Sequence, residues 1–157
     1  MIADTSPVSR TSPTTIRRAV AGDMPAVRAL LAVAGLPLDG VDEAFATGLV
    51  AEQASRIVGA TAIEPYGPMG LLRSVVVEES LRGTGLGRRL VAEAETLATG
   101  IGVRDLYLLT ETAVAWFPRL GYAPLARDAA PPPIATSVEF TVSCVDTGVL
   151  MRRRLEG

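Results

Sequence analysis

A glycine-rich turn between two arginines is the feature of this chain with the clearest chemical meaning. Its sequence, RGTGLGR, spans residues 82–88 and connects an apolar segment to an amphipathic one. Glycines let a backbone approach a ligand closely, and the first N–H groups of a helix that begins here have no partners inside that helix. The helix dipole favours an anion at the same place. We therefore expect a pyrophosphate to bind at Arg82, Gly83, Thr84, Gly85, Leu86, Gly87 and Arg88.

Two familiar phosphate-binding loops do not fit this turn. A nucleoside-triphosphate loop requires a lysine after its last glycine, and this chain contains no lysine. A dinucleotide fingerprint spaces its glycines differently and stands at the first strand of its domain, whereas roughly half of this chain precedes Gly83. The remaining pattern is Arg-x-x-Gly-x-Gly, formed by Arg82, Gly85 and Gly87. The alternative interpretation of this pattern is an ordinary turn from a strand to a helix that binds no ligand.

The turn resembles the acyl-coenzyme-A loop of the GNAT superfamily of N-acetyltransferases. The segment WFPRLGY, residues 116–122, resembles the helix-to-strand ending of the same family. The resemblance covers about residues 14–156. More narrowly, the segments AVRALLAVAGLPLDGVDE, EPYGPMGLLRSVVV and RDLYLLTETA resemble the family branch that is associated with arsenic-resistance operons.

The resemblance implies acetyl-coenzyme A as the cofactor, with its pyrophosphate at residues 82–88 and no metal ion. The pantetheine arm would lie beside the preceding strand and pair with the backbone of Val75 and Val77, as an added strand does. An N–H group of this strand would stabilise the oxyanion that forms when an amine attacks the thioester. Acetyl transfer would then be direct, within a ternary complex, and much of the catalysis would come from positioning.

The groups that would transfer protons depart from the family pattern. Phe117 stands where relatives often carry a general-acid tyrosine, Leu71 aligns with the glutamate of some relatives, and the chain has no asparagine or histidine. We expect Glu64, at the end of the neighbouring strand, to be the base; the alternative is a solvated carboxylate. Tyr66 is the candidate proton donor to the leaving thiolate, and a structural loop tyrosine is its alternative. Two further alternatives do without a protein base: a water molecule could take the amine proton, or the amine could enter already uncharged.

Arg73 interrupts an otherwise apolar strand, and a buried guanidinium is costly unless it is paired. Strand alternation predicts that Arg73 lies on the face of Val75 and Val77. Its partner is either a protein carboxylate, Glu64 or Glu139, or an anionic group of the substrate. The expected substrate-binding residues are Arg73, Ser74 and Glu111.

A mixed sheet is needed to bring these residues together. Apolar and alternating runs predict strands at 15–20, 48–54, 56–64, 69–77, 105–110, 122–125 and 149–155, and helical periodicity predicts helices at about 23–34, 41–47, 85–99 and 113–120. Residues 134–142 fit either a helix or a strand. This order predicts an α/β (α+β) fold: a mixed, mostly antiparallel sheet of about seven strands with helices on both faces. The GNAT resemblance adds a V-shaped splay between the fourth and fifth strands.

Length and composition limit the remaining possibilities. In this chain of 157 residues we expect a disordered tail at residues 1–13 and a single domain at residues 14–157. The net charge of −2 provides no basic surface for nucleic acid. No apolar run is long enough for a membrane span, and the single cysteine, Cys144, fits a reducing cytoplasm.

These features predict a cytoplasmic N-acetyltransferase that uses acetyl-coenzyme A. The expected substrate is the amine of a small anionic or amino-acid-like molecule, and the narrower resemblance suggests arsenic-containing toxins. A homodimer is expected because dimers are frequent in the family. Two alternatives stay open: a protein or peptide N-terminal acetyltransferase, and a non-catalytic acyl-coenzyme-A sensor.

Overall fold

The computed structural model describes residues 13–143 and 148–156 of the chain. Its strands are β1 (Thr14–Arg18), β2 (Gly48–Gln53), β3 (Arg56–Tyr66), β4 (Met69–Val77), β5 (Asp105–Thr110), β6 (Ala123–Leu125) and β7 (Val149–Arg154). Its α-helices are α1 (Met24–Val33), α2 (Val41–Ala44), α3 (Leu86–Gly100) and α4 (Pro132–Ala135). Short 3-10 turns at Ala21–Asp23, Phe45–Thr47, Glu79–Leu81, Phe117–Leu120 and Arg127–Ala129, and a π-helical turn at Glu139–Ser143, complete the elements.

The strands form one seven-stranded sheet with the order β1-β2-β3-β4-β5-β7-β6. Neighbouring strands are antiparallel, except for β4 and β5, which run parallel. The predicted mixed, mostly antiparallel sheet is therefore confirmed.

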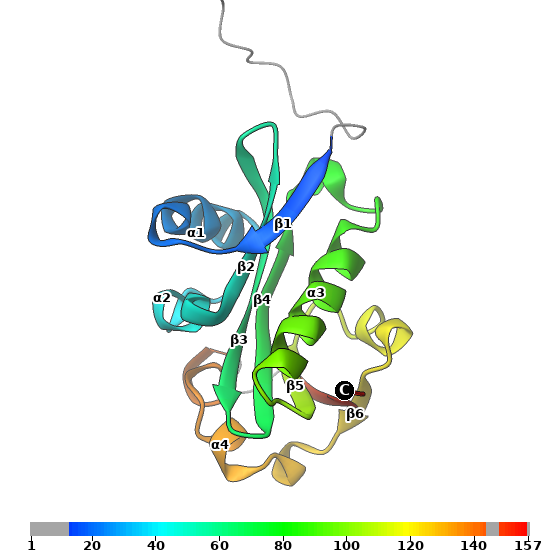
Figure 1. Ribbon diagram of the computed structural model, residues 1–157. Coiled ribbons are helices and arrows are strands. Elements are labelled where there is room, and N and C mark those ends of the chain that lie inside the picture. Colours follow the sequence, from blue (N-terminus) through cyan, green and yellow to red (C-terminus); the bar gives the residue numbers. More distant parts are fainter. Residues whose placement is uncertain (1–12, 144–147, 157) are drawn as a thin grey trace, which may run out of the picture.

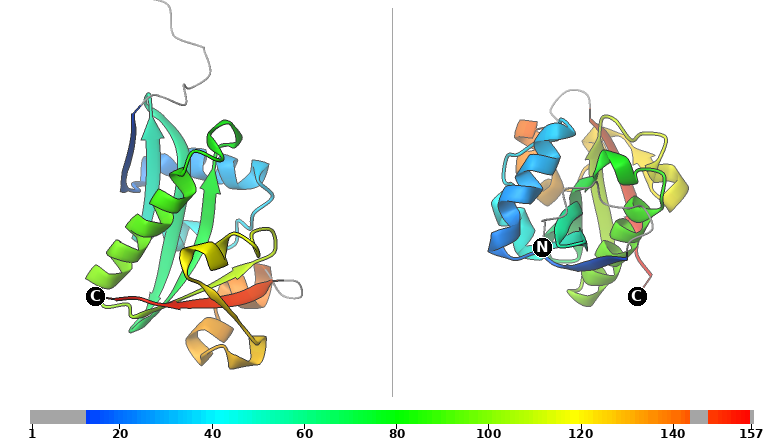
Figure 2. Two further views of the ribbon diagram at one scale, coloured as in Figure 1. Left: turned by 90° about the vertical axis from the view of Figure 1, so that its right-hand side faces the viewer. Right: turned by 90° about the horizontal axis from the view of Figure 1, so that it is seen from above.

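Helices cover both faces of the sheet (Figure 1), as predicted. On one face α1 packs on β2, β3 and β4 through Val27 and Leu31. On the opposite face α3 packs through Val91 and Ala94, and the view from above in Figure 2 shows α1 and α3 on the two sides of the sheet. Because α3 follows β4 so closely in the chain, this packing holds the N-terminus of α3 near the end of β4.

The fourth and fifth strands separate, as the resemblance implied. β4 and β5 pair at three positions, Met69 with Asp105, Gly70 with Leu106 and Leu71 with Tyr107, and within the described residues they share no further pair. In the left view of Figure 2, β7 runs across the direction of β3 and β4. The splay leaves a gap between β4 and β5 that side chains of both faces can line.

A β-bulge interrupts β4 at Ser74. The register of β3 and β4 pairs Ala62 with Arg73 but Ala60 with Val76, so two residues of β4 lie opposite one residue of β3. Ser74 itself has a φ of 60°, in the left-handed region that residues other than glycine rarely adopt. An extra residue in a strand exchanges the faces of all side chains that follow it.

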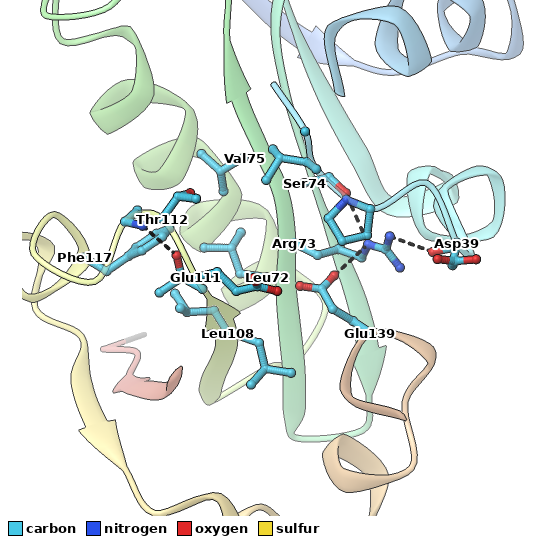
Figure 3. Close-up of a pocket in the computed structure, with 16 residues that line it drawn as sticks. Asp39, Leu72, Arg73, Ser74, Val75, Leu108, Glu111, Thr112, Phe117 and Glu139 are labelled. Carbon is cyan, nitrogen blue, oxygen red and sulfur yellow. Dashed lines mark hydrogen bonds and ion pairs between the residues drawn. The ribbon is translucent and has the colours of Figure 1, made fainter. Parts of the chain in front are cut away.

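This bulge corrects the expected position of Arg73. Val75 packs against the core beneath α3, whereas Val76 packs with α1 on the other face. Arg73 points to that other face, toward Asp39 and away from Val75 (Figure 3). The prediction that Arg73 shares a face with Val75 and Val77 was wrong, because simple alternation does not hold across a bulge.

Two further segments differ from the predicted elements. Residues 113–120 do not form a continuous helix: turns lead into the 3-10 helix at Phe117–Leu120. Pro118 has no N–H group to donate to the preceding turn, which prevents a regular α-helix here. Residues 134–142, which fitted either element, form no strand: α4 ends at Ala135, a turn follows at 136–137, and the π-helical turn begins at Glu139.

Gly59 is a position where β3 and α3 are in close contact. A Cβ at Gly59 would lie 2.9 Å from Cδ1 of Leu90 and 3.1 Å from the carbonyl oxygen of Val76. We expect Gly59→Ala to destabilise the fold by about 1–3 kcal/mol, as overpacking does. Gly100→Ala is the control, because a Cβ there meets nothing within 4 Å and alanine should stabilise the end of α3. Urea denaturation measures both, and similar midpoints for the two variants would contradict this packing.

Some sequence predictions concern residues that the structure does not describe. The proposed tail at 1–13 lies outside the described residues except for Pro13, and Cys144 also lies outside them. Among the described residues, no helix is both long and apolar enough to cross a membrane.

Candidate functional site

A cleft of about 360 Å³ lies where β4 and β5 separate (Figure 3), within the range typical of small-molecule sites. Its walls come from the loop after α1, from β4, from the end of β5 and the turns that follow it, and from the π-helical turn. The residues that line it include Asp39, Arg73, Val75, Glu111, Phe117 and Glu139.

The cleft joins the two faces of the sheet. Leu72, Val75 and Phe117 belong to the core beneath α3. Arg73 and Glu139 lie on the other side of β4, as Figure 3 shows. A ligand on the α3 face and a second ligand on the α1 face can therefore meet between β4 and β5.

The glycine turn has the backbone that an anion-binding turn requires. Gly83 has a φ of 80° and Gly85 a φ of 90°, and a Cβ at either would meet nothing within 4 Å. Gly85 is the N-cap of α3, so the first N–H groups of the helix follow it directly. Arg82, Thr84 and Arg88 are exposed around this turn, and the Thr84 hydroxyl donates to the carbonyl of Leu81. The turn is thus open toward solvent and positive in character.

Gly87 and Leu86 serve the packing of α3. A Cβ at Gly87 would lie 3.2 Å from Cζ2 of Trp116, so a glycine lets the indole lie against the helix. Leu86 is buried in the core beside β2 and β3. The sequence assigned both residues to the cofactor; in the structure the side chain of Leu86 packs in the core and the Cα of Gly87 faces Trp116, which leaves their backbone N–H groups for the predicted role.

The backbone of β4 borders the cleft on the α3 side. Val75 is half-buried and lines the cleft, and it lies beyond the last pair between β4 and β5. The carbonyl oxygen of Val77 accepts a hydrogen bond from Nε of Arg82 at 3.3 Å. Arg82 therefore connects the end of β4 to the glycine turn.

Arg73 is the centre of a buried ion-pair cluster. Its side chain is 0% exposed, with Nη1 2.9 Å from Oε2 of Glu64 and Nε 3.1 Å from Oε2 of Glu139. Nη2 donates to the carbonyl oxygen of Asp39 at 2.7 Å, and Nε donates to the hydroxyl of Ser74 at 3.2 Å. Both carboxylates that the sequence offered as partners contact Arg73, so its guanidinium is engaged by the protein itself.

The two expected acid–base residues lie behind this cluster. Tyr66 donates its hydroxyl proton to Oε1 of Glu64 at 2.6 Å. Burial, followed by this hydrogen bond, raises the pKa of Tyr66 above its ordinary value, which makes the hydroxyl a weaker acid. In the part of the chain that the structure describes, neither Glu64 nor Tyr66 lines the cleft.

Glu139 is the carboxylate of the cluster that reaches the cleft. It is 5% exposed, and burial raises its pKa to about 7, although Arg73 opposes this shift and Glu64 adds to it. The sequence named Glu139 only as a possible partner of Arg73. Its place in the cleft was missed because residues 134–142 had no assigned element; an acid in an apolar segment, SVEF, was the available signal.

A family model for the acetyltransferase (GNAT) domain matches residues 45–124, which is half of the chain and includes β2 to β5, α3 and the glycine turn. The chain belongs to the GNAT acetyltransferase family. The match ends before α4 and Glu139, so the Glu139 wall of the cleft is outside the part that the family model covers.

Two curated relatives each match about half of the chain. An uncharacterized N-acetyltransferase from Chlorobaculum tepidum is 32% identical over 80 residues, which cover 50% of this chain and 51% of the relative. An amino-acid acetyltransferase from Ralstonia nicotianae is 31% identical over 84 residues, covering 52% of this chain and 19% of the relative. The chain thus spans about half, or much less, of the length of these relatives.

Among solved structures, N-acetylglutamate synthase from Neisseria gonorrhoeae, complexed with coenzyme A and N-acetyl-glutamate, superposes with a TM-score of 0.80. The identity is 22%, and the match covers 93% of this chain and 36% of that one. This likeness shows that the GNAT fold extends over nearly the whole chain, including the segments outside the family model.

The residues of this GNAT domain fit coenzyme A at the places that the resemblance implied. The open glycine turn at the N-terminus of α3 suits a pyrophosphate, because a Cβ at Gly83 or Gly85 would project into the free space that a phosphate needs. The backbone of β4 beyond Leu71 borders a cleft instead of a neighbouring strand, which suits an extended pantetheine arm.

Proposed function

We propose that this chain transfers the acetyl group of acetyl-coenzyme A to the primary amine of a small, amino-acid-like molecule. The observation that carries the proposal is the cleft at the splay of β4 and β5, which reaches from the α3 face to the α1 face of the sheet. Membership of the GNAT family and the open turn at Gly83 and Gly85 support the same activity.

Acetyl-coenzyme A supplies a thioester whose carbonyl carbon is open to attack by an amine. The chain would hold the pyrophosphate with the first N–H groups of α3 and with Arg88, and would hold the pantetheine arm along β4 at Val75. An N–H group of β4 near the bulge would donate to the oxyanion. Both reactants would then meet in the cleft, and transfer would be direct within a ternary complex.

The acceptor is proposed from the cleft and from the relatives. One relative is an amino-acid acetyltransferase, and a volume of about 360 Å³ suits a small molecule. Arg73 is already engaged by Glu64, Glu139 and the carbonyl of Asp39, so an anionic group of the substrate would have to compete with these partners for it. Arsenic-containing amino-acid-like toxins, a cytoplasmic location and a homodimer are retained as proposals that rest on the sequence alone.

The acyl-coenzyme-A sensor has one observation in its favour. Phe117, where relatives often carry a tyrosine, is buried and lines the cleft, so this position supplies no hydroxyl to the leaving thiolate. A sensor would bind acetyl-coenzyme A and acetylate nothing, whereas a peptide acetyltransferase would prefer peptides to free amino acids.

Calorimetric titration of acetyl-coenzyme A, followed by an acceptor panel, tests the proposed function. The panel contains the common amino acids, L-glutamate first, simple primary amines and short peptides, and release of free thiol is measured. We expect binding of acetyl-coenzyme A and turnover with an amino acid. Binding without turnover would favour the sensor, and absence of binding by the folded protein would remove the enzymatic proposal.

A further inference from the structure

We propose that Glu139 accepts the proton of the substrate's ammonium group in the cleft, and that Arg73, Glu64 and Tyr66 hold Glu139 in place. This inference rests on the proposed acetyl transfer and names its proton acceptor. It gives to Glu139 the role that the sequence suggested for Glu64.

Access distinguishes the two glutamates. Both oxygens of Glu64 are already engaged, Oε1 by the hydroxyl of Tyr66 and Oε2 by Nη1 of Arg73. Glu139 contacts Nε of Arg73 through Oε2, and over residues 13–143 and 148–156 its Oε1 has no partner. Glu139 also lines the cleft, which Glu64 does not. One oxygen of Glu139 therefore fixes the side chain, and the other is available to a ligand.

The charge of the cleft creates the need for a base. Its described lining contains three carboxylates, Asp39, Glu111 and Glu139, and a single guanidinium, that of Arg73. Such a wall attracts an amine in its ammonium form. An ammonium nitrogen has no lone pair, so it must lose a proton before it can attack a thioester, and the acceptor must lie in the same cleft.

The surroundings of Glu139 suit this role. The charged and titratable groups that act on it are Arg73 on β4 and Glu64 and Tyr66 on β3. The carbonyl of Asp39 holds Arg73 from the other side. Burial raises the pKa of Glu139 to about 7. A base with a pKa near the working pH is deprotonated often enough to accept a proton and basic enough to hold it.

The proton and electron movements balance. One proton passes from the ammonium nitrogen to Oε1 of Glu139, and the freed lone pair forms a bond to the thioester carbon. The carbon–sulfur bond breaks when the oxyanion collapses, and a second proton leaves nitrogen for the departing sulfur. The products are the amide and the free thiol, and Glu139 returns its proton to solvent.

Glu139→Gln tests the proposal with the amino acid that the wild type acetylates fastest. We expect kcat/KM to fall by about 10²–10⁴-fold, the usual contribution of general base catalysis, while acetyl-coenzyme A still binds in the calorimeter. The acid limb of the pH profile should disappear. With hydroxylamine as the acceptor, whose nitrogen is uncharged at neutral pH, the variant should approach the wild-type rate, because no proton has to be removed first.

Three further variants separate this role from a structural one. Glu93→Gln, on the exposed face of α3, should leave the rate unchanged. Glu64→Gln should keep the acid limb but move it to lower pH, because Glu64 raises the pKa of Glu139. Glu111→Gln should also keep the acid limb of the pH profile. The proposal would be overturned if Glu139→Gln left the pH profile unchanged, or if the variant lost as much kcat/KM with hydroxylamine as with the amino acid. Either result would leave the proposed acetyl transfer itself unaffected. A wild type that acetylates no amine would overturn both.

Discussion

Replacing Arg73 with alanine should lower the free energy of unfolding by about 3–5 kcal/mol, because two carboxylates would remain without their cation in the protein interior. The Arg73 side chain is 0% exposed and contacts Glu64 and Glu139, whose side chains are 15% and 6% exposed. The variant also loses the donor to the carbonyl of Asp39. Urea unfolding at neutral pH, followed by circular dichroism, measures the change.

Arg56→Ala is the matched control for this prediction. Arg56 also forms an ion pair with a glutamate, Glu78, at 3.0 Å, but the two side chains are 51% and 22% exposed. Exposed pairs contribute about 0–1 kcal/mol, so the loss should be several times smaller than for Arg73→Ala. Similar losses for the two variants would contradict the burial of the Arg73 cluster.

The loss of unfolding free energy in Arg73→Ala should depend on pH, and this dependence identifies Glu139 as a charged partner of Arg73. Burial raises the pKa of Glu139 from 4.5 to about 7, so the folded state binds this proton more readily than the unfolded chain. The stability that Glu139 contributes is therefore complete below about pH 4.5 and is lost as the pH rises to about 7. Without Arg73 the pKa rises further, and the deficit should be smaller at about pH 5 than at about pH 8. A deficit independent of pH would exclude Glu139 from the cluster.

The elements of the proposed cofactor half are encoded in consecutive residues, and for this reason the sequence predicted these elements well. Residues 69–100 contain the apolar run of β4, the glycine turn and the apolar stripe of α3. Each of these is recognisable from a local sequence pattern. The glycines at 83 and 85 have the positive φ angles that only glycine adopts readily. Family resemblance then supplied the splay, which no local pattern specifies.

The walls of the proposed acceptor half depend on contacts between distant segments, and the sequence predicted these contacts less well. A one-residue bulge at Ser74 decides which face Arg73 occupies, and a bulge leaves no periodic signal in β4. Glu139 reaches the cleft only because a π-helical turn, distant in sequence, packs against Arg73. The sequence identified single residues near the site, such as Arg73 and Glu64. It did not predict their full sets of hydrogen-bond partners, because these depend on tertiary packing.

Gly85→Glu should strongly weaken the binding of acetyl-coenzyme A while the protein stays folded. A carboxylate at the N-cap of α3 would stand in the open space where the pyrophosphate is proposed to lie. Placing like charges together costs several kcal/mol, and each 1.4 kcal/mol is a tenfold change in affinity. We therefore expect the dissociation constant to rise by about 10²–10³-fold, and calorimetric titration at constant salt measures it.

Gly102→Glu separates the charge at the pyrophosphate from backbone strain, which both substitutions introduce. Gly102 follows the opposite end of α3, has a φ of 93° compared with 90° at Gly85, and a Cβ at either position meets nothing within 4 Å. The two variants should therefore lose similar stability on urea unfolding, but only Gly85→Glu should lose affinity for acetyl-coenzyme A. Equal binding by both variants would mean that the glycine turn does not hold the pyrophosphate. That result would remove the glycine turn from the support for the proposed transfer, which would then rest on the cleft between β4 and β5 and on membership of the GNAT family.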